Sequence, residues 1–170
     1  MKENSKIKVG VVGVGHLGRF HIEQYQLIKT VDLVGFFDIN LETSRNVSNM
    51  LNVKSYDHLD DLLDVCDAVS ICTPTSTHFE VSKKVMCKKC HLFIEKPITN
   101  NVQQARELIL LSKKNDTLVQ VGHVERVSVG DDHIGRVMVR FGNSPRASEI
   151  AGRAIKSWRT AWDAATRRAG

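Results

Sequence analysis

Short apolar runs rich in β-branched residues recur along the first 126 residues of this 170-residue chain. Such runs are typical of strands buried on both faces of a parallel sheet. Stretches with apolar residues at helical spacing lie between them. This alternation predicts an α/β fold with a doubly wound parallel sheet. The six predicted strands cover residues 7–12, 32–38, 53–56, 67–72, 91–94 and 117–121.

Five helices are predicted between the strands, from their apolar faces and from residues that favour helix starts. The second of them, over residues 40–51, is mostly polar. Asp57, the Thr77–Glu80 pair, and Asn100 or Asn101 are the expected caps of the last three. The expected inward faces are Leu17, Phe20, Leu27 and Ile28 in the first helix, Leu59, Leu62 and Leu63 in the third, Val81, Val85 and Met86 in the fourth, and Val102, Ala105, Leu108 and Ile109 in the fifth.

A glycine motif, Gly13-x-Gly15-x-x-Gly18, follows the first strand and opens the first helix. Gly13 permits a sharp turn, Gly15 leaves room for a pyrophosphate, and Gly18 lets the helix pack closely on the strand. Unpaired N–H groups at the helix N-terminus attract phosphate. Asp38 lies 20 positions after Gly18, where an acid binds the adenosine ribose. These features predict a Rossmann-type dinucleotide-binding domain; the alternative is a tight strand-to-helix turn in another α/β protein.

Residues that are scattered in sequence are expected to converge at one edge of the sheet, because ligands bind at the carboxyl ends of parallel strands. At the adenosine end, Asp38 should accept hydrogen bonds from the ribose hydroxyls and repel a 2′-phosphate. No arginine stands at position 39 or 40 to neutralise that phosphate. The sequence therefore favours NAD over NADP as the cofactor. The residues expected to converge are Gly13, Asp38, Thr73, Glu95, Lys96 and His123.

The net charge of +5 is unevenly distributed along the chain. Residues 1–126 carry a net charge of +1, which offers no basic stripe for nucleic acid, and residues 127–170 carry +4. No apolar run approaches the ~20 residues of a membrane span. The N-terminus leads into a strand without the apolar segment of a signal peptide. We therefore expect a cytoplasmic protein with neither nucleic-acid nor membrane partners.

Residue usage changes abruptly close to Arg126. The ratio of Lys to Arg shifts from 12:4 before this point to 1:7 after it, and Ala rises from two to seven. We expect a domain over residues 1–126 and an atypical Arg/Ala-rich tail over 127–170. Within the tail, residues 137–141 alternate like a strand and residues 151–165 have helical apolar spacing. A change of coding frame would explain the shift; an internal deletion is the competing explanation.

Three further motifs accompany the glycine motif: Cys-Thr-Pro-Thr-x-x-His at 72–78, Phe-Ile-Glu-Lys-Pro at 93–97 and Val-Gly-His-Val-Glu-Arg at 121–126. As a set, they resemble the Gfo/Idh/MocA oxidoreductases over residues 6–126. The second and third motifs resemble members that act on sugars or nucleotide sugars. The resemblance implies hydride transfer between NAD or NADP and a sugar, nucleotide-sugar or polyol carbon.

The resemblance places Lys96 beside the nicotinamide as the catalytic residue that moves the hydroxyl proton. Taken alone, Lys96 would be an ordinary lysine at a strand end, because lysine is usually exposed. His78 lines the nicotinamide pocket or simply starts a helix, and His123 has the same two interpretations. The cofactor-binding residues expected from motif and resemblance together are Gly13, Gly15, His16, Leu17, Gly18, Asp38, Thr73, Pro74, His78, Glu95 and Lys96.

The sequence also departs from the resemblance. Family members follow this region with a substrate domain, which supplies an Asp and a His to the active site and often an oligomer interface. The 44 residues after Arg126 are too few for that domain. A catalytically silent cofactor-binding module is therefore the alternative function, and homo-oligomerisation stays open. Lys89 replaces the usual glycine before the fifth strand, so we expect that turn to lack its left-handed residue.

Four cysteines complete the candidate chemistry. Cys66 and Cys72 flank a predicted strand and are expected to be small core residues. Cys87 and Cys90 have the spacing of a metal or redox pair, but no second pair stands at zinc-site spacing. They also follow a helix C-terminus, where the helix dipole does not favour a thiolate. We therefore expect no metal site and no disulfide.

Overall fold

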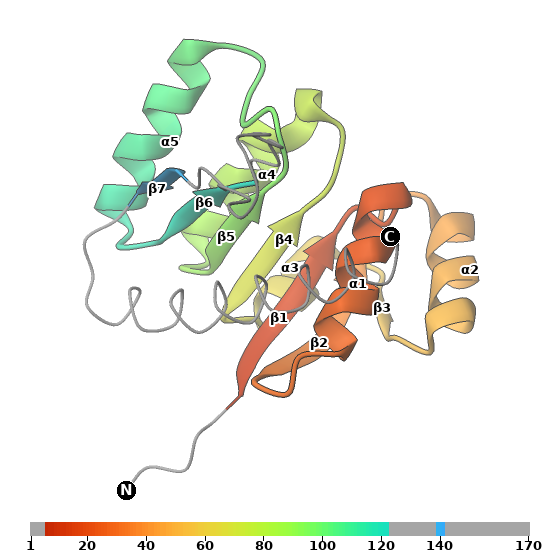
Figure 1. Ribbon diagram of the computed structural model, residues 1–170. Helices are drawn as coiled ribbons and strands as arrows, with labels where there is room; N and C mark the ends of the chain where they lie inside the picture. The colour runs from red at the N-terminus through yellow and green to blue at the C-terminus, as the bar shows by residue number, and fades with distance from the viewer. Residues whose placement is uncertain (1–5, 123–138, 142–170) are drawn as a thin grey trace, which may run out of the picture.

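The computed structural model describes residues 6–122 and 139–141, and these form one twisted sheet flanked by helices (Figure 1). The strand order is β3-β2-β1-β4-β5-β6-β7. Strands β1 to β6 are parallel and β7 pairs antiparallel with β6. The predicted doubly wound α/β fold is confirmed. The strands are β1 Ile7–Val12, β2 Val31–Phe37, β3 Ser55–Tyr56, β4 Ala68–Ile71, β5 His91–Ile94, β6 Val119–Val121 and β7 Val139–Phe141.

Two apolar cores lie on opposite faces of the sheet. On one face, α1 and α2 contribute Ile22, Tyr25 and Val47 to the core. On the other, α3, α4 and α5 contribute residues such as Leu62 and Met86. Since β1 supplies residues to both cores, the glycine motif begins at the centre of the molecule. The helices are α1 His16–Gln26, α2 Leu41–Leu51, α3 Leu59–Leu63, α4 Thr75–Cys87 and α5 Val102–Lys114.

The apolar face predicted for the first helix is only partly correct: Phe20 is half-buried and Ile28 packs against the core, but the two leucines do not. Leu17 and Leu27 are exposed, at 48% and 63%. The buried face is one position further along and includes Gly18, His21 and Tyr25. Polar residues are tolerated there because the sheet supplies partners for their hydrogen bonds. In α5, Leu108 is buried as expected, whereas Val102 is 62% exposed.

Of the three helix caps predicted, the one for α5 is correct and the other two are wrong; Asn40, which was not predicted as a cap, also caps its helix. The side chains of Asn40 and Asn101 accept backbone N–H groups at the starts of α2 and α5. The N-terminal cap of α3 is His58 rather than Asp57, and it makes no side-chain capping bond. Helix α4 begins at Thr75, after Pro74, so the capping box expected at Thr77 does not form.

The turn before β5 keeps its left-handed residue, contrary to expectation. Lys89 adopts a φ of 58°, and its N–H donates to the carbonyl of Met86. The turn geometry is therefore retained without glycine, in a conformation that a lysine side chain disfavours.

The predicted tail lies outside the described residues, apart from β7. Its expected strand over residues 137–141 is found at Val139–Phe141. His123 and the expected helix over residues 151–165 also lie outside the described residues. Within the described part of the chain, no helix has the length and apolar character needed to cross a bilayer.

Candidate functional site

The glycine-rich loop is a tight turn that only small residues fit. Gly13 has a φ of 85°, and its N–H donates to the carbonyl of Phe37 at 2.8 Å. A Cβ at Gly13 would lie 2.9 Å from the backbone nitrogen of Thr73, and one at Gly18 would collide with the carbonyl of Gly13. These two glycines therefore bring β1, α1 and the turn after β4 into direct backbone contact.

Gly15 differs from the other two glycines because open space surrounds it. Among the described residues, and apart from its own chain neighbours, no atom lies within 4 Å of the position that its Cβ would occupy. Gly15 is the N-terminal cap of α1, and no side chain caps that terminus. The first N–H groups of a helix need an acceptor, and the helix dipole makes it an anion. This terminus therefore has both the space and the donors to bind a phosphate.

Asp38 directly follows β2, on the other side of the cavity from the turn after β4. Its Oδ2 accepts the N–H of Val14 at 2.7 Å, and its Oδ1 accepts the N–H of Asn40 at 2.9 Å. Each carboxylate oxygen has two lone pairs, so both oxygens keep capacity for a further donor. The two backbone bonds fix the orientation of the carboxylate beside the glycine-rich loop.

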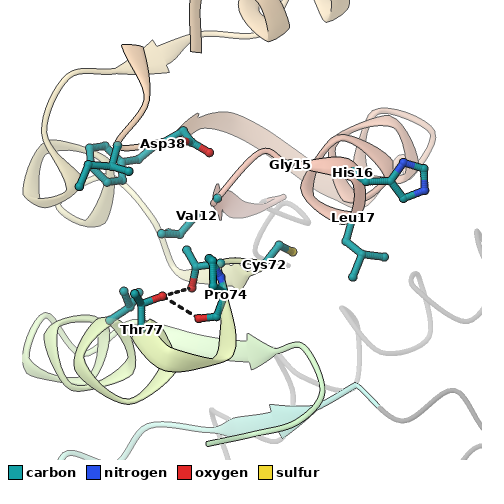
Figure 2. Close-up of a pocket in the computed structure, with 13 residues that line it drawn as sticks. Val12, Gly15, His16, Leu17, Asp38, Cys72, Pro74 and Thr77 are labelled. Atoms are coloured by element: carbon teal, nitrogen blue, oxygen red, sulfur yellow. Dashed lines mark hydrogen bonds between the residues drawn. The ribbon is translucent and has the colours of Figure 1, made fainter. Parts of the chain in front are cut away.

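A cavity of about 700 Å³ connects these elements (Figure 2). This volume lies in the range of small-molecule and cofactor sites. The ring of His16 points away from Asp38 and Pro74, so His16 contributes mainly its backbone (Figure 2). Of the residues predicted to bind the cofactor, the cavity is lined by Gly13, Gly15, His16, Leu17, Asp38, Thr73 and Pro74.

Six further lining residues were not among the predicted cofactor contacts. The Thr77 Oγ1 lies 2.8 Å from the Thr73 Oγ1 and 2.8 Å from the Pro74 carbonyl oxygen, both at hydrogen-bond distance (Figure 2). Val81 follows Thr77 by one helical turn, and Ile39 directly follows Asp38. Their positions beside predicted site residues are the signal that would have identified them. The six are Val12, Phe37, Ile39, Cys72, Thr77 and Val81.

His78 lies in the first turn of α4 but does not line the cavity. It is 1% exposed. Its Nε2 lies 2.8 Å from the carbonyl oxygen of Thr73, and its Nδ1 lies 2.9 Å from that of Pro97. The structure therefore favours the interpretation of His78 as a buried helix-start residue, which links the turns after β4 and β5.

Glu95 and Lys96 follow β5 and are not part of the cavity lining. Lys96 is exposed. Glu95 is buried, and its Oε1 contacts the Nε2 of His21 at 2.9 Å. Burial alone would raise the pKa of Glu95, but the His21 hydrogen bond and the nearby positive charges lower it overall. Glu95 is thus an ionised carboxylate that His21 hydrogen-bonds.

The cysteines have different environments. Burial, followed by the negative charge of Glu95, raises the pKa of Cys72 well above its usual value, which keeps this cavity residue a thiol. Burial likewise raises the pKa of Cys66 to about 12 and that of Cys90 to about 11. The Cys90 Sγ lies 3.3 Å from the carbonyl oxygens of both Leu63 and Cys66, either of which can accept its one S–H, whereas Cys87 is exposed. This geometry identifies Cys90 as a core residue of the α3–α4 face.

Sequence comparison relates this chain to known oxidoreductases. Residues 7–123 match the model of the Gfo/Idh/MocA group, described as an oxidoreductase family with an NAD-binding Rossmann fold. The UDP-N-acetylglucosamine 3-dehydrogenase of Acidithiobacillus ferrooxidans is 42% identical over 121 residues, which cover 71% of this chain and 38% of that protein. The myo-inositol 2-dehydrogenase of Thermotoga maritima is 28% identical, with 79% and 45% covered.

Solved structures extend the comparison to the fold. The structure of the same A. ferrooxidans dehydrogenase superposes with a TM-score of 0.68, covering 72% of this chain and 40% of that one. GenD2 from gentamicin A biosynthesis, solved in complex with NAD, shares the fold at 24% identity and a TM-score of 0.66. The chain thus spans about two fifths of the length of these relatives.

Proposed function

Because the chain belongs to the Gfo/Idh/MocA family of oxidoreductases, we propose that it binds NAD in the cavity beside Gly15 and serves hydride transfer to or from a sugar, nucleotide-sugar or polyol carbon. The observation that carries this proposal is the open space at Gly15, at an uncapped helix N-terminus. Asp38 faces the same cavity. This arrangement fits a dinucleotide, whose pyrophosphate and ribose need those two kinds of group.

Each part of the cavity has a proposed role in holding the cofactor. The N-terminus of α1 would bind the pyrophosphate, and Asp38 would accept the adenosine ribose hydroxyls. Ile39, next to Asp38, and Val81 of α4 give the cavity apolar surface, which suits a flat base. The turn at Thr73 and Pro74 lies on the β4 side, toward Lys96. The cofactor would therefore extend across the sheet, from the end of β2 toward the end of β5.

Lys96 is the proposed catalytic residue. Bound NAD supplies a carbon that accepts or returns a hydride. The chain must then move the proton of the substrate hydroxyl, and an exposed lysine beside the site can hold that proton. The substrate class is proposed from the relatives, whose names identify a nucleotide sugar and an inositol as substrates.

Calorimetric titration of NAD into the chain and into Gly15→Ala tests the proposed site. Open space around Gly15 means that alanine fits the fold, but its methyl group would occupy the space proposed for the pyrophosphate. We expect NAD to bind the original chain and affinity to fall about tenfold or more, or ~1.4 kcal/mol, in the variant. The melting temperature should change by less than about 2 °C.

Glu23→Ala is the matched control, because Glu23 is an exposed residue of the same helix. It should leave NAD affinity unchanged. Equal NAD affinity in Gly15→Ala and the original chain would contradict the proposed pyrophosphate position. Assays of sugars, nucleotide sugars and inositols with NAD then separate an active enzyme from a cofactor-binding module that does not turn over.

A further inference from the structure

A buried hydrogen bond joins the phosphate-binding end of the site to its catalytic end. His21 lies on the inner face of α1, one turn after Gly18. Its Nε2 lies 2.9 Å from the Oε1 of Glu95, which follows β5 directly. Because the carboxylate is ionised and can only accept, the imidazole Nε2–H is the donor. The side chains are 1% and 11% exposed, so water competes little for this contact.

Residues of α1 and the ends of β4, β5 and β6 meet at Glu95. Its backbone N–H donates to the carbonyl of Ile71 at the end of β4, and its Oε2 accepts the N–H of Lys96 at 3.3 Å. A Cβ at Gly122, after β6, would lie 3.3 Å from Oε1 and 2.7 Å from the Phe93 ring. A larger residue at that position would therefore push against the carboxylate or the ring.

His21 is held from its other sides by aromatic rings. Its imidazole packs on the Phe93 ring of β5 with a centroid distance of 5.5 Å. It meets the Tyr25 ring of its own helix edge-on at 6.3 Å. These contacts fix the direction in which Nε2 points. The hydrogen bond therefore fixes the position of Glu95, the neighbour of Lys96, relative to α1.

We propose that His21 and Glu95 form a positioning pair that sets the place of Lys96 relative to the N-terminus of α1. The inference rests on the proposed function, because one bound dinucleotide would have to reach both points. Its pyrophosphate would lie at the start of α1 and its nicotinamide beside Lys96. An error of 1 Å in that separation is enough to misplace a reacting group. Glu95 then acts through Lys96 and His21, in addition to any direct contact with the cofactor.

Protection of Lys96 from acetylation tests the proposal. The chain is treated with acetic anhydride, with and without saturating NAD, and modification of each lysine is followed by mass spectrometry. In the original chain, we expect NAD to slow acetylation of Lys96 about fivefold or more, because a correctly placed cofactor covers it. Lys113, an exposed lysine in the last turn of α5, serves as the internal reference.

Two variants disturb the pair in different ways. His21→Phe keeps a ring against Phe93 but removes the donor, and Glu95→Gln keeps the shape but cannot serve both His21 and Lys96 as an acceptor. At NAD concentrations that saturate each variant, protection of Lys96 should fall below about twofold. Saturation removes any effect of affinity, so a purely structural role would leave the protection intact. Glu95→Gln is nearly isosteric, which provides the test if His21→Phe does not fold.

Tyr25→Phe is the matched control. It removes a buried hydrogen bond of 2.6 Å between Tyr25 and Ser70, on the same face of α1. Protection of Lys96 should survive this change. Loss of protection would show that removing any contact of α1 with the sheet exposes Lys96, and it would overturn the proposal. Full protection in Glu95→Gln, or NAD binding without protection in the original chain, would also overturn it. Absence of NAD binding to the original chain would instead contradict the proposed function.

Discussion

The carboxylate of Asp38 accepts a hydrogen bond of 2.7 Å from the backbone N–H of Val14, in the glycine-rich loop. The residue proposed to bind the ribose is thus hydrogen-bonded to the loop that would bind the pyrophosphate. A second backbone bond, from Asn40, restrains the other oxygen at 2.9 Å. The negative charge of Asp38 consequently has a fixed position in the cavity and cannot swing away from an added phosphate.

The first prediction is a preference for NAD over NADP. The 2′-phosphate of NADP would lose a hydrogen bond and meet a like charge at Asp38, so we expect a preference of ~1–3 kcal/mol. Calorimetric titration of both cofactors into the chain measures it. Asp38→Asn, which removes the charge but keeps the size, should narrow the preference. Equal or tighter binding of NADP to the original chain would remove Asp38 from its assigned role.

The second prediction concerns Lys96→Met. Lys96 is exposed and lies outside the cavity lining, so its removal should change NAD affinity by less than about tenfold, or ~1.4 kcal/mol. In an enzyme with a complete active site, the same change should lower kcat far more than affinity, because the lysine acts on the moving proton. A hundredfold loss of NAD affinity would instead make Lys96 a clamp for the cofactor.

The strands and the glycine-rich loop were predictable because their signals are local. The first strand was predicted at its observed bounds, Ile7–Val12, because it is apolar throughout and glycine follows immediately. The cavity lining at Asp38, Thr73 and Pro74 follows from the rule that carboxyl ends of parallel strands share an edge. These features need no knowledge of side-chain packing.

The positioning pair was not predictable because it depends on a partner far away in sequence. His21 and Glu95 are 74 positions apart in the sequence. The buried face of α1 can carry polar groups because Glu95 and Ser70 form hydrogen bonds with them. Apolar spacing alone selected a face that includes Leu17 and Leu27, which are exposed. Helix periodicity indicates how residues share faces, but the tertiary partners decide which face is buried.

The third prediction is a loss of stability as the pH falls, caused by His91. Its Nδ1 accepts the N–H of Leu118 at 3.1 Å. Protonation of Nδ1 would break this hydrogen bond, because two N–H donors would then face each other. Burial lowers the pKa of His91 below 6.5, although Asp116 and Asp67 oppose the shift. The unfolded chain therefore binds the proton first, and stability present above pH 6.5 declines as the pH falls toward the folded-state pKa.

Urea unfolding at pH values from about 7.5 to about 5.5 measures this effect. Replacing His91 with Gln should reduce the dependence of the unfolding free energy on pH. His58→Gln is the control, because His58 is an exposed histidine whose side chain makes no capping bond. An unaltered pH dependence in His91→Gln would show that other groups cause the acid sensitivity.

The last prediction is that Lys89→Gly stabilises the fold. Lys89 has a φ of 58° and is exposed, so its side chain contributes little packing while its Cβ strains the backbone. Glycine adopts this conformation without that strain, and we expect the free energy of unfolding to rise by ~0.5–1 kcal/mol. Lys89→Ala is the matched control: it removes the same charge and chain but keeps the Cβ. An equal gain from alanine would attribute the effect to the lysine side chain and its charge, and would exclude relief of backbone strain in the turn between α4 and β5.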